Sequence, residues 1–403
     1  MDAHLAQWLN LVLRWIHVVT GAAWIGTSFY FNWLNSRLAP PARPEAGVGG
    51  ELWAVHGGGF YRVVKYAVGP EHLPGTLHWF KWEAYATWLS GIALLVFVYY
   101  LGAAAYLIDP QVARLDTTAA IAVGVGTLVA AWLVYDALCR SPLGRVPLVL
   151  ATVLFALGTA LAWGLAQLLS PRAAYIHVGA ALGTIMAANV FRVIIPSQRD
   201  MVAALAQARA PDSRLGEQAA LRSLHNNYLT LPVLFIMVSG HYPATYGHRL
   251  SWLILAGLTL VGVATRHWFN LRNQGRGLPN AWLLPGAAVA VAALAVVTAP
   301  PGGADGRAAV GSRAADAASF ADVRVIVARR CAPCHSAAPT VPGIAAAPSG
   351  VALDTPQEIR AGAERILAVA VQTRTMPLGN VTGMTDEERE LVRHWIRAGA
   401  KLR

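Results

Sequence analysis

The chain has 403 residues, of which 13% are charged and 56% hydrophobic, whereas soluble proteins have about 25% charged and 45–50% apolar residues. This composition excludes an ordinary soluble domain and indicates a protein of the lipid bilayer. The formal net charge of +11 does not indicate nucleic acid as a partner, because the basic residues lie mainly between apolar runs, where they orient membrane helices.

Apolar runs follow one another along most of the chain. A hydrocarbon core of about 30 Å takes about 20 residues of helix. Runs long enough to cross it lie at residues 8–34, 78–101, 117–138, 146–169, 173–196, 223–241, 249–269 and 280–299. The predicted fold is all-α, with an eight-span transmembrane bundle over residues 1–299. Polar residues within the runs should line the bundle interior, because lipid offers them no partner.

The loop between the first two runs contains His56 followed by three glycines at 57–59. Glycine permits both a tight hairpin and the close approach of the backbone to a ligand. Both interpretations stay open at this stage.

Polar residues within the runs form an outer and an inner group. Because ionisable groups inside a membrane are costly, they indicate function, although asparagines can also hold helices together. Asn226 and Asn227, next to His225, offer several donors and acceptors for a planar polar ligand. The outer group is His17, His177 and His241, and the inner group includes His78, Lys81, Glu83, Asn189, Arg192, His225, Asn226, Asn227, Tyr228, Arg266, His267 and Asn270.

A second domain follows the bundle. Prolines and glycines after Ala299 predict a linker at residues 300–317, and a domain at 318–403. A helix is expected over 320–330, and Thr385 with Glu388 predicts a capping box at the start of a last helix. Two helices that flank a loop with a C-x-x-C-H string at residues 331–335 suit a small class I-like cytochrome c domain.

The haem loop is the C-x-x-C-H string formed by Cys331, Cys334 and His335. Two thiols at this spacing can bond the haem vinyl groups while the next imidazole binds the iron. A zinc half-site is the alternative, but no second Cys/His pair follows it. We expect Met376 as the sixth ligand, because it lies in a Thr-Met-Pro-Leu loop, whereas Met384 directly precedes a helix cap and is better explained by packing.

The haem string also orients the chain. Covalent haem attachment takes place on the outer side of the bacterial inner membrane, so we expect the cytochrome domain and, after eight spans, the N-terminus in the periplasm. The positive-inside rule agrees with this orientation. The inner loops carry Arg37, Arg43, Arg62, Lys65, Arg140, Arg145, Arg199, Arg209, Arg214, Arg272 and Arg276, whereas the short outer loops carry only Arg114, Arg172 and Arg249.

The polar strings of the bundle resemble those of the bacterial integral-membrane urate oxidases (urate hydroxylases), in which an eight-span domain is fused to a cytochrome c. The strings are Arg-Trp-Ile-His-Val with Gly-Ala-Ala-Trp-Ile-Gly (14–26), His-Gly-Gly-Gly-Phe-Tyr (56–61), Leu-His-Trp-Phe-Lys-Trp-Glu-Ala-Tyr (77–85), His-Val-Gly-Ala (177–180), Ala-Asn-Val-Phe (188–191), Ile-Pro-Ser-Gln (195–198), His-Asn-Asn-Tyr-Leu-Thr-Leu-Pro (225–232) and Arg-His-Trp-Phe-Asn (266–270). The resemblance implies oxidation of urate to 5-hydroxyisourate with water as the oxygen source. Electrons would leave through haem c to an acceptor such as another cytochrome c or a terminal oxidase.

Urate is a planar monoanion, so its site needs cations, in-plane amides, an aromatic surface and a base. The inner group offers each kind of residue, and the sequence does not decide among them. The candidates are Lys81, Arg192 or Arg266 for charge; Asn189, Asn226 and Asn227 for the ring edges; Trp79, Phe60 or Tyr228 for stacking; and His78, Glu83 or His225 as the base.

The inner group and the outer haem are separated by most of a core of about 30 Å, too far for one tunnelling step. We therefore hypothesise one or two b-type haems in the bundle, with His17 and His177 as an axial pair. Inner histidines such as His78, His225 or His267 could hold a second haem. Alternatively, urate binds near the outer face, close to His177 and His241. A different function also stays open, namely a transmembrane conduit from quinol or a dehydrogenase to the periplasm.

Overall fold

The structure is a computed structural model that describes residues 3–70, 72–299, 319–341, 344 and 346–402. The predicted linker at 300–317 lies outside the described residues.

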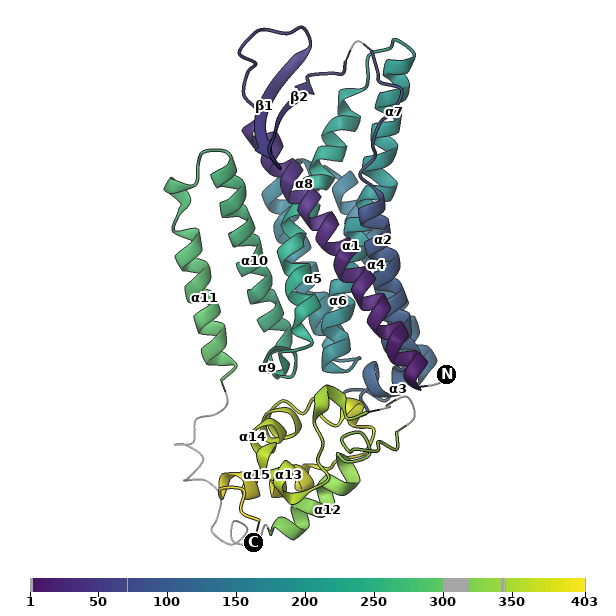
Figure 1. The fold of residues 1–403 in the computed structure, drawn as a ribbon, viewed down its shortest axis with the longest axis vertical. Helices are drawn as coiled ribbons and strands as arrows, with labels where there is room; N and C mark the ends of the chain where they lie inside the picture. Colours follow the sequence, from purple (N-terminus) through teal and green to yellow (C-terminus); the bar gives the residue numbers. More distant parts are fainter. Residues whose placement is uncertain (1–2, 71, 300–318, 342–343, 345, 403) are drawn as a thin grey trace.

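Long helices form a bundle, and a smaller helical domain lies at one end of it (Figure 1). The bundle contains α1 (Ala3–Arg37), β1 (Val48–His56), β2 (Gly59–Tyr66), α2 (Trp82–Leu94), η1 (Leu95–Tyr100), α3 (Ala103–Tyr106), α4 (Thr117–Arg140), η2 (Pro142–Arg145), α5 (Pro147–Ala166), α6 (Pro171–Asn189), η3 (Val190–Ile194), α7 (Ile195–Ala206), α8 (Ser213–Ser239), α9 (Pro243–Tyr246), α10 (Ser251–Asn273), η4 (Leu278–Asn280) and α11 (Leu283–Val297). The C-terminal domain contains α12 (Phe320–Arg330), η6 (Pro348–Gly350), α13 (Pro356–Ala361), α14 (Ala363–Ile366), η7 (Leu367–Gln372), η8 (Leu378–Asn380) and α15 (Asp386–Arg397).

Seven helical stretches in the described part of the chain are long and apolar enough to cross a membrane. They coincide with seven of the eight predicted runs. The remaining run, 223–241, lies in α8 up to Ser239. This helix has 27 residues but is less apolar because of the polar residues between Arg222 and Tyr228. The seven stretches are His4–Arg37, Trp82–Tyr100, Thr117–Arg140, Pro147–Ala166, Pro171–Ala206, Ser251–Asn273 and Leu278–Val297.

Short polar residues begin several of these helices. The side chain of Asp116 accepts a hydrogen bond from the Ala119 amide at 2.8 Å and caps α4. Asp212 caps α8 in the same way. Such caps satisfy amides that have no partner inside the helix.

A β-hairpin joins α1 to α2. Its strands are antiparallel, with Val55 opposite Phe60, and Gly57 and Gly58 turn the chain with φ of +57° and +80°. This confirms the hairpin interpretation of the glycine string. The fold is mainly helical, in agreement with the predicted all-α class, and it adds a two-stranded hairpin, because positive-φ glycines between β-branched and aromatic residues favour a hairpin.

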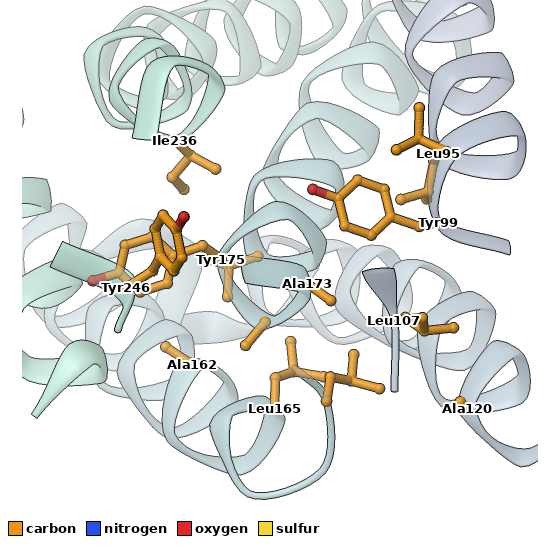
Figure 2. Packing of buried hydrophobic residues seen from close by; sticks show 14 of the residues in the cluster. Leu95, Tyr99, Leu107, Ala120, Ala162, Leu165, Ala173, Tyr175, Ile236 and Tyr246 are labelled. Atoms are coloured by element: carbon orange, nitrogen blue, oxygen red, sulfur yellow. The ribbon is translucent and has the colours of Figure 1, made fainter. Parts of the chain in front are cut away.

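The main buried cluster fixes α6 among its neighbours. It joins Leu95 and Tyr99 of η1 to Ala173 and Tyr175 of α6 and extends to Tyr246 of α9 (Figure 2). This packing holds the N-terminal half of α6 in the interior.

The C-terminal domain agrees with the helices expected from its sequence. Helix α12 spans the expected residues, and Thr385 and Glu388 form the capping box that begins α15. The rings of Phe320 and Trp395 join the two helices at 5.6 Å between centroids. Met384 is only 1% exposed and packs in the apolar core of this domain; the choice of Met376 over Met384 as haem ligand stays a prediction.

Figure 1 shows which segments lie at each end of the bundle. The N-terminal end of α1 and the C-terminal domain lie at the same end of the bundle, and the hairpin lies at the other. Helix α8 packs against α6 and α10, so it belongs to the bundle although it is less apolar than the seven stretches.

Candidate functional site

Three buried polar side chains meet between α8 and α10. Arg266 Nε donates to Asn227 Oδ1 at 3.0 Å, and Asn270 Nδ2 donates to the same oxygen at 2.9 Å. Asn227, Arg266 and Asn270 are 1%, 5% and 6% exposed. The Arg266 guanidinium lies over the Phe29 ring of α1, 3.8 Å from its centroid. We call Asn227, Arg266 and Asn270 the open cluster.

The open cluster has polar atoms without partners. Asn227 Nδ2, Arg266 Nη2 and Asn270 Oδ1 are buried and form no hydrogen bond in the described part of the chain. A buried donor or acceptor left unpaired costs about 1–3 kcal/mol. Across the described part of the chain, no carboxylate forms an ion pair with Arg266. The cluster therefore presents two donors, one acceptor and an uncompensated positive charge, which suits an anionic ligand.

A second arginine cluster lies between α8, α4 and α6. Arg222 donates to Asp136 at 2.6 Å, and its guanidinium lies 4.9 Å from the centroid of the Tyr135 ring. Asn189 Nδ2 donates to the Tyr135 hydroxyl and to Asn226 Oδ1, both at 2.9 Å. We call Tyr135, Asp136, Asn189, Arg222 and Asn226 the paired cluster. Because these hydrogen bonds join three helices, the paired cluster holds the bundle together.

His225, one of the predicted bases, contacts the paired cluster. Its Nδ1 lies 2.8 Å from the Tyr135 hydroxyl and 3.9 Å from Cys139 Sγ. His225 and Asn227 are two residues apart on α8 and therefore point to different sides of the helix. The structure thus separates His225 from the open cluster.

The other predicted bases lie at the start of α2. His78 is exposed, and Lys81 and Glu83 are half-buried around the first turn. The His78 ring contacts Phe80, which contacts Phe31 of α1. Because Arg266 contacts Phe29, two residues from Phe31, α1 stands between this group and the open cluster.

The predicted stacking residues are also dispersed. Phe60 lies on the hairpin and is 80% exposed, whereas Trp79 packs on a small apolar cluster beside α2. Tyr228 is half-buried, and its hydroxyl lies 2.6 Å from His267 Nδ1 on α10. Of the three, only Tyr228 lies on the helix pair that carries the open cluster.

His17 of α1 packs against α2. Its Nδ1 lies 3.0 Å from the Thr87 carbonyl oxygen and 3.1 Å from the Ser90 hydroxyl. The ring also lies beside Gly91, where an added Cβ would come within 3.0 Å of it. Hydrogen bonding at Nδ1 orients the ring and leaves Nε2 for a ligand, as in metal-binding histidines.

His177 of α6 is completely buried and packs against α4. Its Nδ1 donates to the Ala173 carbonyl at 2.8 Å, and its Nε2 lies 3.3 Å from the Tyr100 hydroxyl. A Cβ added at Gly124 would approach Nε2 to 2.7 Å. The two histidines thus contact different helices, and their pairing around a haem stays a prediction.

The C-terminal domain brings its predicted ligand residues to one apolar core. Cys331 and Met376 both pack against it, and His335 Nδ1 donates to the Val351 carbonyl at 3.0 Å. This bond leaves Nε2 free for iron. Burial raises the pKa of the Cys331 thiol to about 11, so the thiol is neutral at pH 7. No three His, Cys, Asp or Glu side chains among the described residues are grouped as around a zinc ion.

Arg389 of α15 clamps the loop that carries Met376. It is 1% exposed, and its Nη1 donates to the carbonyl oxygens of Ala370 and Met376. Because these bonds fix the backbone of Met376, Arg389 is a positioning residue for the expected ligand.

Sequence reasoning missed several residues of these sites, namely Phe29, Tyr135, Asp136, Arg222 and Arg389. Asp136 and Arg222 could have been recognised, because a charge inside or beside an apolar run indicates a partner in the interior. The sequence carries no signal that Phe29 lies under Arg266, because that contact depends on how α1 crosses α10.

Comparison with known proteins gives one family match. Residues 3–299 match the family described as urate oxidase N-terminal. No curated protein and no solved structure matches the chain.

Proposed function

The chain belongs to the urate oxidase N-terminal family, and we propose that it oxidises urate at the open cluster of a membrane-spanning bundle and passes the electrons to haem c on the C-terminal domain. The observation that carries the proposal is Arg266, a buried cation without a carboxylate partner among the described residues. Urate is a monoanion at neutral pH and would supply the missing charge.

The unpaired atoms of the open cluster match the edge of a purine. Arg266 Nη2 and Asn227 Nδ2 can donate to urate carbonyl oxygens or to its deprotonated nitrogen, and Asn270 Oδ1 can accept from a ring N–H. Hydrogen bonds to a charged partner contribute about 1.5–3 kcal/mol each. Urate would therefore satisfy the atoms that the protein leaves without partners.

The proposed reaction converts urate and water to 5-hydroxyisourate, two protons and two electrons. The predicted bases His78, Glu83 and His225 are the candidates for accepting the protons. Lys81, Asn189, Asn226 and Tyr228 stay predicted substrate residues, although Asn189 and Asn226 already bond each other and the paired cluster.

A lipid environment is supported by the surface of the helices. Every residue of α11 is at least partly exposed, and Val289 and Val296 are 69% and 76% exposed. Apolar helices with such surfaces are stable in lipid rather than in water. We propose eight spans in a bacterial inner membrane, with α8 as the polar span. The N-terminus and the C-terminal domain, which share one end of the bundle, would then be periplasmic.

Cys331, Cys334, His335 and Met376 are the residues proposed to hold haem c. Two of them, Cys331 and Met376, pack against the same apolar core, which fits that role. A haem bound there would supply a one-electron couple, so the two electrons of one urate would leave in succession to an external acceptor such as a cytochrome c or terminal oxidase. Asn227 lies about 18 Å along α8 from Ser239 at the domain end. This separation supports an intermediate haem b, for which His17 and His177 remain the proposed ligands.

The test uses the purified full-length protein without oxygen. Urate should reduce haem c without forming hydrogen peroxide, and Arg266→Gln should lower kcat/KM about 100-fold, because a hydrogen bond to a charge is lost. Arg276→Gln, an exposed arginine just beyond α10, is the control and should behave like the wild type. Reduction of the haem by quinol but not by urate would instead establish the electron conduit.

A further inference from the structure

The C-terminal domain touches the bundle through the loop that carries Met376. Helix η8 directly follows Met376 and Pro377 and contacts α3 at the bundle end. The contact leaves a cavity of only ≈ 20 Å³, which has room for about one water molecule. Its lining comes from Ala105, Tyr106, Asp109, Ser170, Pro171, Arg172 and Tyr246 of the bundle and from Arg374, Thr375, Leu378 and Gly379 of the C-terminal domain.

Two glycines, one on each side, allow this close approach. A Cβ added at Gly379 would lie 2.6 Å from the Ile108 carbonyl oxygen. A Cβ added at Gly247, just after α9, would lie 2.6 Å from Thr373 Cβ. Real Cβ atoms do not come so close, so any side chain at either position would push the two domains apart.

Charges also match across the contact. Asp109 of the bundle is only 7% exposed and acts electrostatically on the buried Arg389. Asp109 also lines the cavity at the contact together with Arg374 of the C-terminal domain.

Packed aromatic rings lead from this contact into the bundle. Tyr106, which lines the cavity, lies 6.1 Å from Tyr99, and Tyr99 lies 6.2 Å from His177, both between ring centroids. Tyr99 belongs to the buried cluster of Figure 2. Electron tunnelling weakens less through packed atoms than across gaps or water. The contact is thus continuous with the histidine proposed to hold a bundle haem.

We propose that the loop at residues 373–380 is permanently docked on the bundle end formed by α3 and α9, and that this docked face is where the C-terminal domain receives electrons. The external acceptor must then use another face, since the bundle covers this one. The inference rests on the proposed function for its electron donor, whereas the docking itself does not.

The experiment uses the full-length protein with Gly379→Ala, Gly247→Ala and the control Gly383→Ala. Gly383 has the same kind of positive φ, +66° against +52° for Gly379, but an added Cβ would meet only Arg330 Nη1 at 3.6 Å. Hydrogen exchange should show protected amides at 104–109 and 373–380 in the wild type and in Gly383→Ala, and faster exchange in the other two variants. In those two variants urate should reduce haem c severalfold more slowly, while ascorbate reduces it as in the wild type.

Two results would overturn the inference. In the first, the amides of Gly379→Ala or Gly247→Ala exchange faster, yet urate reduces the haem as fast as in the wild type. In the second, the amides at 104–109 and 373–380 are unprotected in the wild type. If quinol but not urate reduces the wild-type haem, the proposed function fails. The inference is then decided by comparing the rate of haem reduction by quinol in the glycine variants and the wild type. A wild-type haem that neither donor reduces would contradict both.

Discussion

The paired cluster and the open cluster are built from the same parts. In each, a buried arginine lies over an aromatic ring, and its guanidinium donates to the side-chain oxygen of an asparagine. They differ in one group, because Arg222 has Asp136 and Arg266 has no carboxylate among the described residues. Arg222 with its own counter-ion stabilises the fold, whereas Arg266, which lies beside the unpaired polar atoms of Asn227 and Asn270, is prepared for an anionic ligand.

The largest effect should come from removing the counter-ion of the paired cluster. Asp136→Asn leaves Arg222 buried and unpaired, and breaking a buried pair costs about 3–5 kcal/mol. Thermal unfolding in detergent or nanodiscs should show the loss. The double variant Asp136→Leu with Arg222→Met should recover much of it, because both charges are then absent. A single variant as stable as the wild type would show that the two clusters do not differ in this way.

The converse change gives the open cluster a counter-ion. Asn270→Asp places a carboxylate beside Arg266 and removes the bond that Asn270 Nδ2 donates to Asn227, so urate-driven haem reduction should fall about 100-fold, since urate must compete with a built-in anion. Saturating urate at about 100 Kd should stabilise the wild type by about 2.7 kcal/mol and the variant hardly at all. Full activity in Asn270→Asp would remove the open cluster from the urate site.

A third buried arginine, Arg389, tests whether the comparison extends to the C-terminal domain. Arg389→Lys keeps the charge but cannot reproduce the guanidinium bonds to two carbonyl oxygens. We expect a stability loss of about 1–3 kcal/mol, together with loss of the absorption band that marks a thioether on ferric haem. The control is Arg393→Lys, a more exposed position on the same helix, which should keep the absorption band. The band is therefore the informative signal.

The smallest effect concerns an ion pair in the water-exposed domain. Burial raises the pKa of Glu388, but hydrogen bonds from Arg330 and Thr385 outweigh it and hold the pKa below the ordinary value of 4.5. The stabilisation is therefore present above about pH 4.5 and lost as the pH falls below it. The melting temperature of Glu388→Gln should approach that of the wild type as the pH falls from 5 to 3. A constant difference would show that the ion pair does not contribute.

The sequence predicted the parts of this protein that depend on local chemistry. Apolar runs gave seven of the long helices, and the capping box at Thr385 was correct, because hydropathy and caps act within a few residues. Glycines at 57–59 allowed a hairpin. The spacing of the haem string places two thiols and an imidazole close together, and the binding of haem by this string and by the candidate histidines stays a prediction.

Only the tertiary structure divided the inner polar residues into separate sites. Asn226 and Asn227 are neighbours in sequence, yet the helix turns one toward α6 and the other toward α10. The sequence placed His78 and His225 in one inner group with Arg266. In the structure α1 stands between His78 and Arg266, and His225 points to the other side of α8. Which arginine has a counter-ion depends on the helix opposite each one, and no local pattern encodes that.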